Sequence, residues 1–85
     1  MEYSYRNKKY LTAGTVEVCY NVVDGIICNT LINGDFFGSR DVRELAEILN
    51  GTLHVPEELK AKLSKIDVGK FILNMSNDEF FSLLI

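Results

Sequence analysis

The spacing of the apolar residues changes its period at residues 34–38, and this change constrains the fold more than any other feature of the sequence. Before it, apolar residues recur at every second position, which is typical of β-strands; after it, they recur every three or four positions, as in amphipathic helices. The segment consists of Gly34, Asp35, Phe36, Phe37 and Gly38. Because glycine permits sharp backbone turns, its two glycines predict a corner between a sheet and the helices that follow it.

The part of the chain before this corner predicts three antiparallel strands. Residues 3–11 mix tyrosines with basic side chains, which is typical of an edge strand protected against further pairing. Val16, Val18 and Tyr20 recur with the two-residue period of a half-buried second strand. The Asp-Gly pair at residues 24–25 suits the centre of a type I′ turn, so the second and third strands should form a tight hairpin.

The third strand is expected to be irregular. The predicted turn places Val22 opposite Ile27 in the hairpin register. Ile27 and Ile32 cannot both face the core along a regular strand, because side chains alternate between the two faces. A β-bulge near Cys28 and Asn29 would restore the phase and bring both isoleucines inward.

Two helices are predicted directly after the corner. Residues 40–50 carry one apolar stripe, typical of an amphipathic helix. Ser39 is placed to be its N-cap, and Gly51 follows where a helix commonly ends. A second helix should begin at Pro56, because proline suits the first turn of a helix.

The end of the chain predicts a third helix and a loop that contributes to the core. Ser76 and Glu79 have the spacing of a capping box at a helix start. The preceding stretch, residues 67–74, is expected to be a loop or a short turn that inserts Phe71 and Ile72 into the core.

Together these elements predict a two-layer α+β fold, a three-stranded antiparallel sheet followed by three short helices packed on one face. A chain of 85 residues has room for one core, so residues 1–85 are expected to form a single domain. A net charge of -3 argues against nucleic acid as a partner. No apolar run is long enough to span a membrane or resembles a signal peptide, so a cytoplasmic location without a membrane partner is expected.

A search for catalytic chemistry finds little. The chain lacks the motifs of a phosphate-binding loop, a nucleophile elbow or a metal-binding helix. Cys19 and Cys28 fall on one face of the sheet in diagonal positions, which does not favour a disulfide. They also lie far from His54 in the sequence, so a zinc site is not expected. Both are expected to be thiols packed as small apolar side chains. His54 has no evident partner and is expected on a surface loop. Three carboxylates at helix starts are better explained by capping than by acid catalysis: Asp67, Asp78 and Glu79.

The segment at the corner remains the candidate functional site. Asp35 is expected to cap local amide groups. Phe36 and Phe37 are adjacent, and two adjacent rings at a corner cannot easily both enter one core. One ring is therefore expected to lie exposed as a contact for another domain. Arg40, at the start of the first helix, could reach a phosphate or an acidic residue of that partner.

The order of these motifs is specific. It comprises Gly-Thr-Val-Glu-Val at residues 14–18, Val-Val-Asp-Gly-Ile-Ile at 22–27, the segment 34–38, Leu-Asn-Gly at 49–51, and the closing Ser76, Glu79, Phe80 and Leu-Leu-Ile at 83–85. Over nearly its whole length the chain resembles the C-terminal accessory domain of lipoate-protein ligases. The resemblance implies a fold related to that of iron-sulfur scaffold and sulfur-acceptor proteins.

The resemblance also implies a function. In that family a larger N-terminal domain uses ATP and magnesium to convert lipoate to lipoyl-adenylate, then transfers the lipoyl group to a lysine of an acceptor protein. The small domain binds none of these cofactors, carries no catalytic residue and supports adenylation by packing on the catalytic domain, in cis or as a separate subunit. A lipoyl acceptor domain is a second implied partner. The candidate contact residues are Gly34, Asp35, Phe36, Phe37, Gly38 and Arg40.

Two alternatives stay open from the residues alone. The first is a sulfur-acceptor or scaffold protein that uses Cys19 or Cys28, which requires an exposed thiol in an electropositive setting. The second is a generic protein-interaction module.

Overall fold

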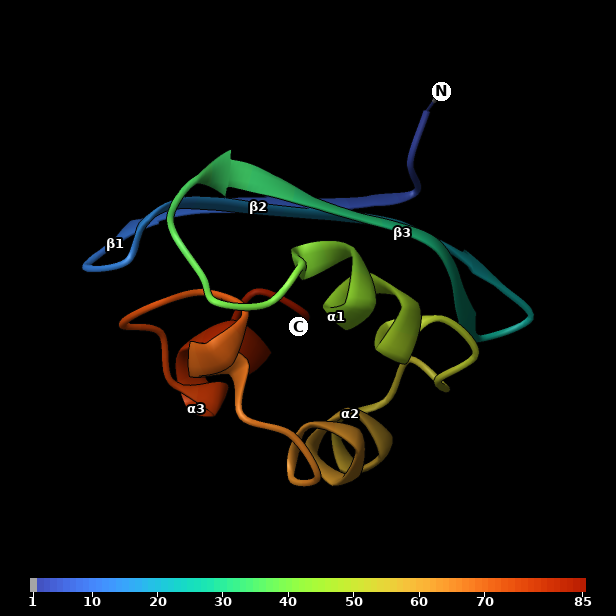
Figure 1. Cartoon of the computed structure of the whole chain (residues 1–85). Helices are drawn as coiled ribbons and strands as arrows, with labels where there is room; N and C mark the ends of the chain where they lie inside the picture. Colours follow the sequence, from blue (N-terminus) through green and yellow to red (C-terminus); the bar gives the residue numbers. More distant parts are fainter. Residues whose placement is uncertain (1) are drawn as a thin grey trace.

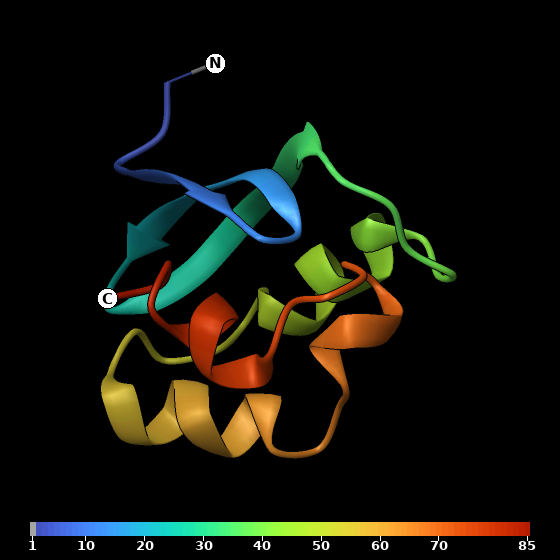
Figure 2. The same ribbon diagram turned by 90° about the vertical axis from the view of Figure 1, so that its left-hand side faces the viewer.

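The computed structural model describes residues 2–85, which form a three-stranded sheet with helices on one face (Figure 1). The elements in order are β1 (Tyr5–Leu11), β2 (Gly14–Val23), β3 (Ile26–Asp35), α1 (Val42–Leu49), α2 (Pro56–Leu63), the 3₁₀ helix η1 (Val68–Lys70) and α3 (Asn77–Phe81). The sheet order is β1-β2-β3, and both pairs are antiparallel. The side view in Figure 2 shows the same two layers, sheet above and helices below. The predicted α+β fold is confirmed, while its relation to the sulfur-acceptor fold stays a prediction.

The hairpin between β2 and β3 turns at the predicted residues. Asp24 and Gly25 both have positive φ, 52° and 79°, as a type I′ turn requires. Val22 pairs with Ile27, which confirms the predicted register.

The predicted bulge lies in β3. Between Cys28 and Leu31 the strand has one residue more than β2, so Asn29 and Thr30 together oppose Tyr20 alone. Asn29 takes a positive φ of 53°, the left-handed conformation found at the first position of one common bulge type. The isoleucines on either side are both buried: Ile27 and Ile32.

Helix α1 begins later than predicted. Its N-cap is Asp41, whose Oδ1 accepts a hydrogen bond from the Arg43 N–H at 2.9 Å. The N-cap prediction for Ser39 is therefore wrong. Ser39 instead donates its N–H and its hydroxyl to the Lys70 carbonyl, 3.0 Å and 3.1 Å away, and this pairing keeps its backbone outside the helix. Gly51 does follow the helix end with a positive φ of 88°.

The helix starts at Pro56 and Ser76 are confirmed. Pro56 occupies the first helical position of α2. At α3 the Glu79 N–H donates to Ser76 Oγ and the Ser76 N–H to Glu79 Oε1, both at 3.0 Å, which is the predicted capping box.

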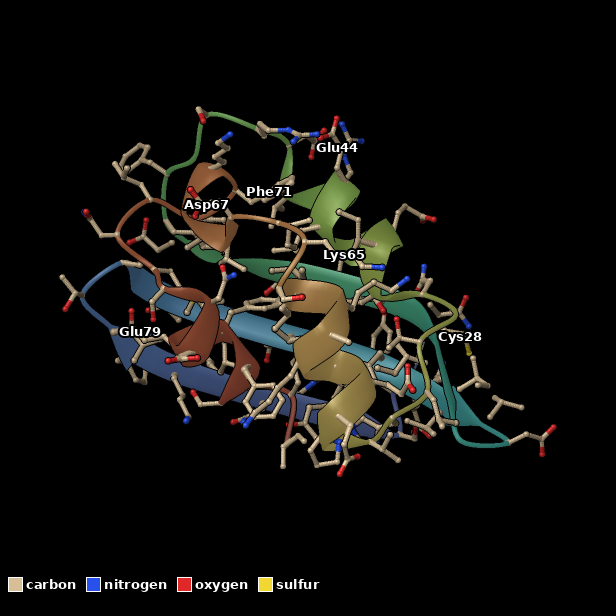
Figure 3. All side chains as sticks on the ribbon, turned by 90° about the horizontal axis from the view of Figure 1, so that it is seen from below. Cys28, Glu44, Lys65, Asp67, Phe71 and Glu79 are labelled. Atoms are coloured by element: carbon tan, nitrogen blue, oxygen red, sulfur yellow. The ribbon has the colours of Figure 1, made fainter. Side chains whose placement is uncertain are left out.

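The stretch at residues 67–74 contains the three-residue 3₁₀ helix η1, which agrees with the short turn predicted as one alternative. Asp67 caps η1 by accepting a hydrogen bond from the Gly69 N–H at 3.0 Å, as its position at a helix start indicated. Phe71 and Ile72 are 2% and 0% exposed, so both side chains enter the core as predicted. Figure 3 shows Phe71 between η1 and α1.

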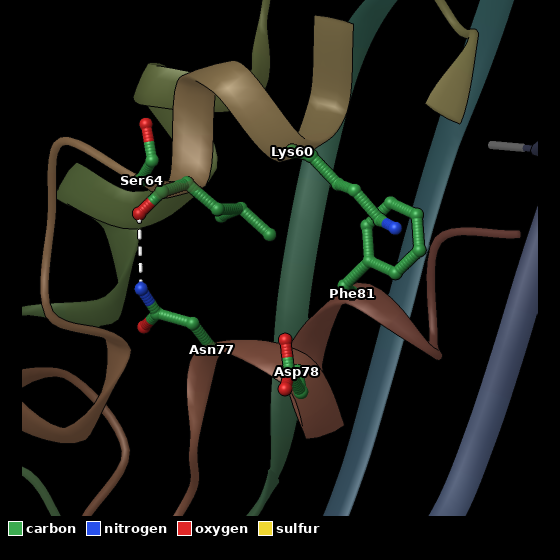
Figure 4. A pocket seen from close by; sticks show the side chains of 6 residues that line it. Lys60, Ser64, Asn77, Asp78 and Phe81 are labelled. Carbon is green, nitrogen blue, oxygen red and sulfur yellow. Dashed lines mark hydrogen bonds between the residues drawn. The ribbon is translucent and has the colours of Figure 1, made fainter. Parts of the chain in front are cut away.

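One side chain joins the ends of three helices. Asn77 Nδ2 donates to the carbonyls of Leu63 and Ile66, at 3.0 Å and 2.9 Å, and its Oδ1 accepts from the Val68 N–H at 2.9 Å. The first of these bonds is drawn in Figure 4. The Leu63 carbonyl also accepts the Ile66 N–H at 3.1 Å, but the Ile66 carbonyl and the Val68 N–H depend on Asn77 for a partner.

Replacing Asn77 by Ala is expected to lower the free energy of unfolding by about 2–3 kcal/mol, since three hydrogen bonds are lost and partly buried backbone groups are left unpaired. Urea unfolding followed by circular dichroism measures the change. Asn33→Ala is the matched control, because Asn33 is exposed on β3, and it should change stability by less than about 0.5 kcal/mol. Equal losses in the two variants would contradict this role.

Candidate protein interaction surface

The segment at residues 34–38 is not the tight corner that its glycines suggest. β3 continues through Gly34 to Asp35, and the chain then runs as an extended loop, residues 36–41, down to α1 (Figure 1). Gly34 has a φ of 146° and lies so close to the Thr15 carbonyl of β2 that a Cβ would overlap it. Asp35 pairs with Thr15 in the ladder, and its carboxylate accepts no hydrogen bond within residues 2–85. The predicted capping role of Asp35 is wrong.

The loop is held by backbone hydrogen bonds to the segment around η1. The Leu73 N–H donates to the Phe37 carbonyl at 2.6 Å, and the N–H groups of Ser39 and Arg40 donate to the Lys70 carbonyl at 3.0 Å. We call residues 37–40 and 70–73 the paired segments. At Gly38 the two backbones approach so closely that a Cβ would overlap the Phe71 carbonyl, which explains a glycine here.

The two adjacent phenylalanines have opposite environments. Phe36 is partly buried and packs against the core, whereas Phe37 is 80% exposed. The prediction of one inner and one outer ring is confirmed. Leu73, which is hydrogen-bonded to Phe37 through the backbone, is 54% exposed. Two large apolar side chains are therefore exposed on neighbouring, hydrogen-bonded backbone segments, as is common at contact surfaces.

Next to this apolar pair is a hollow of about 370 Å³, which we call the basic hollow. It is lined by Arg40, Ser64, Lys65, Ile66, Asp67, Lys70 and Phe71. Arg40 Nη2 lies 2.7 Å from Glu44 Oε2, and its guanidinium carbon lies 4.8 Å from the centre of the Phe71 ring. Figure 3 shows the labelled Glu44, Lys65 and Phe71 grouped at this side of the helical layer. Three cationic side chains thus lie here with two carboxylates, Asp67 in the wall and Glu44 paired with Arg40.

A second hollow, about 270 Å³, lies between α2 and α3 (Figure 4). Its wall includes Lys60, whose ammonium nitrogen lies 5.1 Å from the centre of the Phe81 ring, and the exposed Asp78 in the first turn of α3. This hollow presents one cation and one carboxylate, so it has no excess of either charge.

Neither cysteine forms a disulfide. Cys19 is 1% exposed within β2, and Cys28 is half-buried within β3. A buried strand thiol does not match the exposed, electropositive setting of reactive cysteines. The observed burial of Cys19 weighs against its use as a sulfur acceptor.

His54 lies on a loop as predicted, but it is partly buried and has partners, so the prediction that it lacks one is wrong. Its Nε2 lies 2.8 Å from the Tyr20 hydroxyl and 2.9 Å from the Leu84 carbonyl, and its ring packs edge-on against Tyr5 and Tyr20. The Tyr20 hydroxyl also donates to the Leu84 carbonyl at 3.0 Å. Burial, helped by the neighbouring Tyr5, raises the pKa of Tyr20. This cluster was missed because its members are far apart in the sequence.

Within residues 2–85, no three His, Cys, Asp or Glu side chains are grouped closely enough to hold a metal ion. In the same part of the chain, no helix is long and apolar enough to cross a membrane.

Comparison with known proteins connects the chain to a family. A family model described as the C-terminus of bacterial lipoate protein ligase matches residues 1–84. The chain is 32% identical to the lipoate-protein ligase of Streptococcus pyogenes serotype M5 (strain Manfredo) over 83 residues, 98% of the chain and 24% of that protein. It is 29% identical to lipoate-protein ligase 2 of Staphylococcus aureus (strain Mu50 / ATCC 700699) over 84 residues, 99% of the chain and 25% of that protein. The chain thus spans about a quarter of the length of the curated relatives it matches.

The two phenylalanines should respond differently to truncation. Phe36→Ala is expected to lower the free energy of unfolding by about 2 kcal/mol, because a partly buried ring leaves a cavity. Phe37→Ala should change it by less than about 0.5 kcal/mol, because the ring contacts mainly solvent. Thermal or urea unfolding of both variants measures the difference. A comparable loss for Phe37→Ala would mean that this ring also supports the core.

The buried Tyr20 predicts a loss of stability at high pH. In the unfolded chain its phenol ionises near its ordinary pKa of about 10, whereas burial keeps the folded form protonated. Above pH 10 the unfolded state therefore binds fewer protons, and the free energy of unfolding should fall as the pH rises, by at most about 1.4 kcal/mol per pH unit. Urea unfolding between pH 9 and pH 11.5 measures this slope.

Tyr20→Phe should make that slope shallower, although it lowers stability at neutral pH by removing the hydroxyl. Tyr10→Phe is the matched control, because Tyr10 is 79% exposed, and it should keep the slope of the unmodified chain. An identical slope in all three proteins would show that Tyr20 is not its source.

Proposed function

Because the chain belongs to the family of bacterial lipoate protein ligase C-terminal domains, we propose that it is the non-catalytic accessory domain of a lipoate-protein ligase. The observation that carries the proposal is the family match over residues 1–84, together with relatives about four times as long. The activity named for those relatives then belongs to the whole ligase, with this domain as one part.

In this proposal the catalytic domain, not this one, uses ATP, magnesium and lipoate and transfers the lipoyl group to an acceptor lysine in the cytoplasm. The small domain is joined to the catalytic domain in cis or acts as a separate subunit. A lipoyl acceptor domain is a second candidate partner. The contribution of this chain is to bind and position its partner, and no step of the chemistry takes place on its side chains.

The paired segments support this role physically. Phe37 and Arg40 are carried on a loop whose backbone is already hydrogen-bonded to Leu73 and Lys70. Binding through such a preformed surface requires little ordering of the backbone, so more of the contact energy contributes to affinity. We propose that residues 34–38 and Arg40 face the catalytic domain, which the accessory domain covers during adenylation. Covering the pocket would exclude water and hold the loops that bind the phosphates.

A chimeric ligase tests the proposal. In the Streptococcus pyogenes relative, this chain replaces the C-terminal quarter that it matches; the truncated ligase and a fusion to an unrelated domain of similar size are controls. Lipoate-dependent exchange of pyrophosphate into ATP measures adenylation. We expect truncation to lower the rate at least about tenfold and the chimera to restore most of it, whereas this chain alone should show no activity. A chimera no more active than the truncated ligase would refute the proposed role.

A further inference from the structure

We propose that the basic hollow receives an acidic segment of the ligase's catalytic domain, with Phe37 as the apolar contact beside it. This inference rests on the proposed function and specifies the chemistry of the partner surface. It concerns Arg40, Lys65 and Lys70, which lie in different parts of the chain and line one hollow.

The first argument is charge. The whole chain has a formal net charge of -3, yet three cations line the basic hollow, against the Asp67 carboxylate in its wall and Glu44, which is paired with Arg40. Within residues 2–85, Lys65 and Lys70 form no ion pair. Asp67, the one carboxylate of the wall, accepts the Gly69 N–H as the cap of η1. Two ammonium groups are therefore available to an incoming carboxylate, and complementary charge favours such an encounter.

The second argument is rigidity. Arg40 forms a 2.7 Å ion pair with Glu44 and lies over the Phe71 ring, which together favour one placement of its side chain. The Lys70 carbonyl accepts the N–H groups of Ser39 and Arg40, which joins two sides of the hollow through the backbone. Only the lysine side chains must be ordered when a partner binds, so the entropic cost stays small.

The third argument is continuity with the exposed apolar pair. Arg40 follows Phe37 by three residues, and Lys70 precedes Leu73 by three, with both couples on the paired segments. Phe37 is 80% and Leu73 54% exposed. Aromatic anchors beside a polar rim with complementary charge are the usual composition of protein interfaces.

These features favour a protein partner over a free phosphate compound. A small phosphate would use the lysines but would leave Phe37 and Leu73 in water. The Phe71 ring is 2% exposed, so it offers no face on which a nucleotide base could stack. The relatives carry about three quarters of their length outside the matched region, and the proposed function assigns the catalytic domain to that part.

Zero-length carbodiimide cross-linking of the chimera tests the inference, because it joins an amine only to a carboxylate that it contacts. Peptide mass spectrometry should find Lys65 or Lys70 linked to Asp or Glu residues of the catalytic part. Lys60 is the matched control, since it is exposed on α2 and lines the hollow between α2 and α3, and it should give no such link.

Charge reversal supplies a second measurement. Lys65→Glu with Lys70→Glu should lower adenylation by the chimera about tenfold, whereas Lys60→Glu should leave it unchanged. The double variant Lys65→Arg with Lys70→Arg should keep most of the activity of the chimera, since arginine keeps the charge. It should give no cross-links at these positions, because the lysine amines are gone. Circular dichroism of each isolated variant confirms that it folds.

The outcomes separate the two proposals. The chimera could be active but give none of these cross-links, with the Lys65 and Lys70 reversals as harmless as Lys60→Glu. That outcome would overturn the inference of an acidic partner segment but would not contradict the proposed accessory role. An inactive chimera would overturn both. If sodium phosphate shifted the amide resonances of residues 64–71 and the cross-links were absent, the hollow would bind a small anion and the inference would be wrong.

Discussion

The inner face of the sheet supports the whole domain, because none of the helices is long enough to be stable alone. α1 and α2 have eight residues each and α3 has five, while isolated helices shorter than about 12–15 residues are marginal in water. Each helix therefore depends on burying its apolar side. Val16, Val18 and Tyr20 of β2 provide the fully buried centre of that face. The helical layer, and with it the basic hollow, exists only while the sheet is intact.

The sequence predicted well those features that depend on neighbouring residues. The turn at Asp24 and Gly25 and the capping box at Ser76 and Glu79 are local arrangements, and both are present. The bulge near Asn29 was predicted because two isoleucines had to share one face, which is again a property of one strand.

Features that depend on residues distant in the sequence were not predicted. The sequence predicts Ser39 as the N-cap of α1, but its hydroxyl donates to the Lys70 carbonyl, 31 residues away, and Asp41 caps the helix instead. His54 lacked a neighbour in the sequence that could orient it, and its partners Tyr20 and Leu84 come from the sheet and from the end of the chain.

The candidate surface illustrates the same division. One exposed ring was predicted from the adjacency of Phe36 and Phe37, but which ring it is depends on packing. The basic hollow was not predicted, because Arg40, Lys65 and Lys70 are brought together by the paired segments and by the end of α2. Of its three cations, only Arg40 stood out in the sequence, at the start of a predicted helix.

The hydrogen bonds at the end of the chain have a mechanical consequence. The Leu83 carbonyl accepts hydrogen bonds from the Tyr5 hydroxyl and the Asn7 side chain of β1, and Lys9 binds Ser82. The first strand and the last residues are thereby joined to each other by hydrogen bonds. A force that pulls on the chain ahead of β1 would act on these hydrogen bonds as well as on the ladder between β1 and β2. These hydrogen bonds help the domain to move as one rigid body, because they hold the edge strand β1 in place in addition to its pairing with β2.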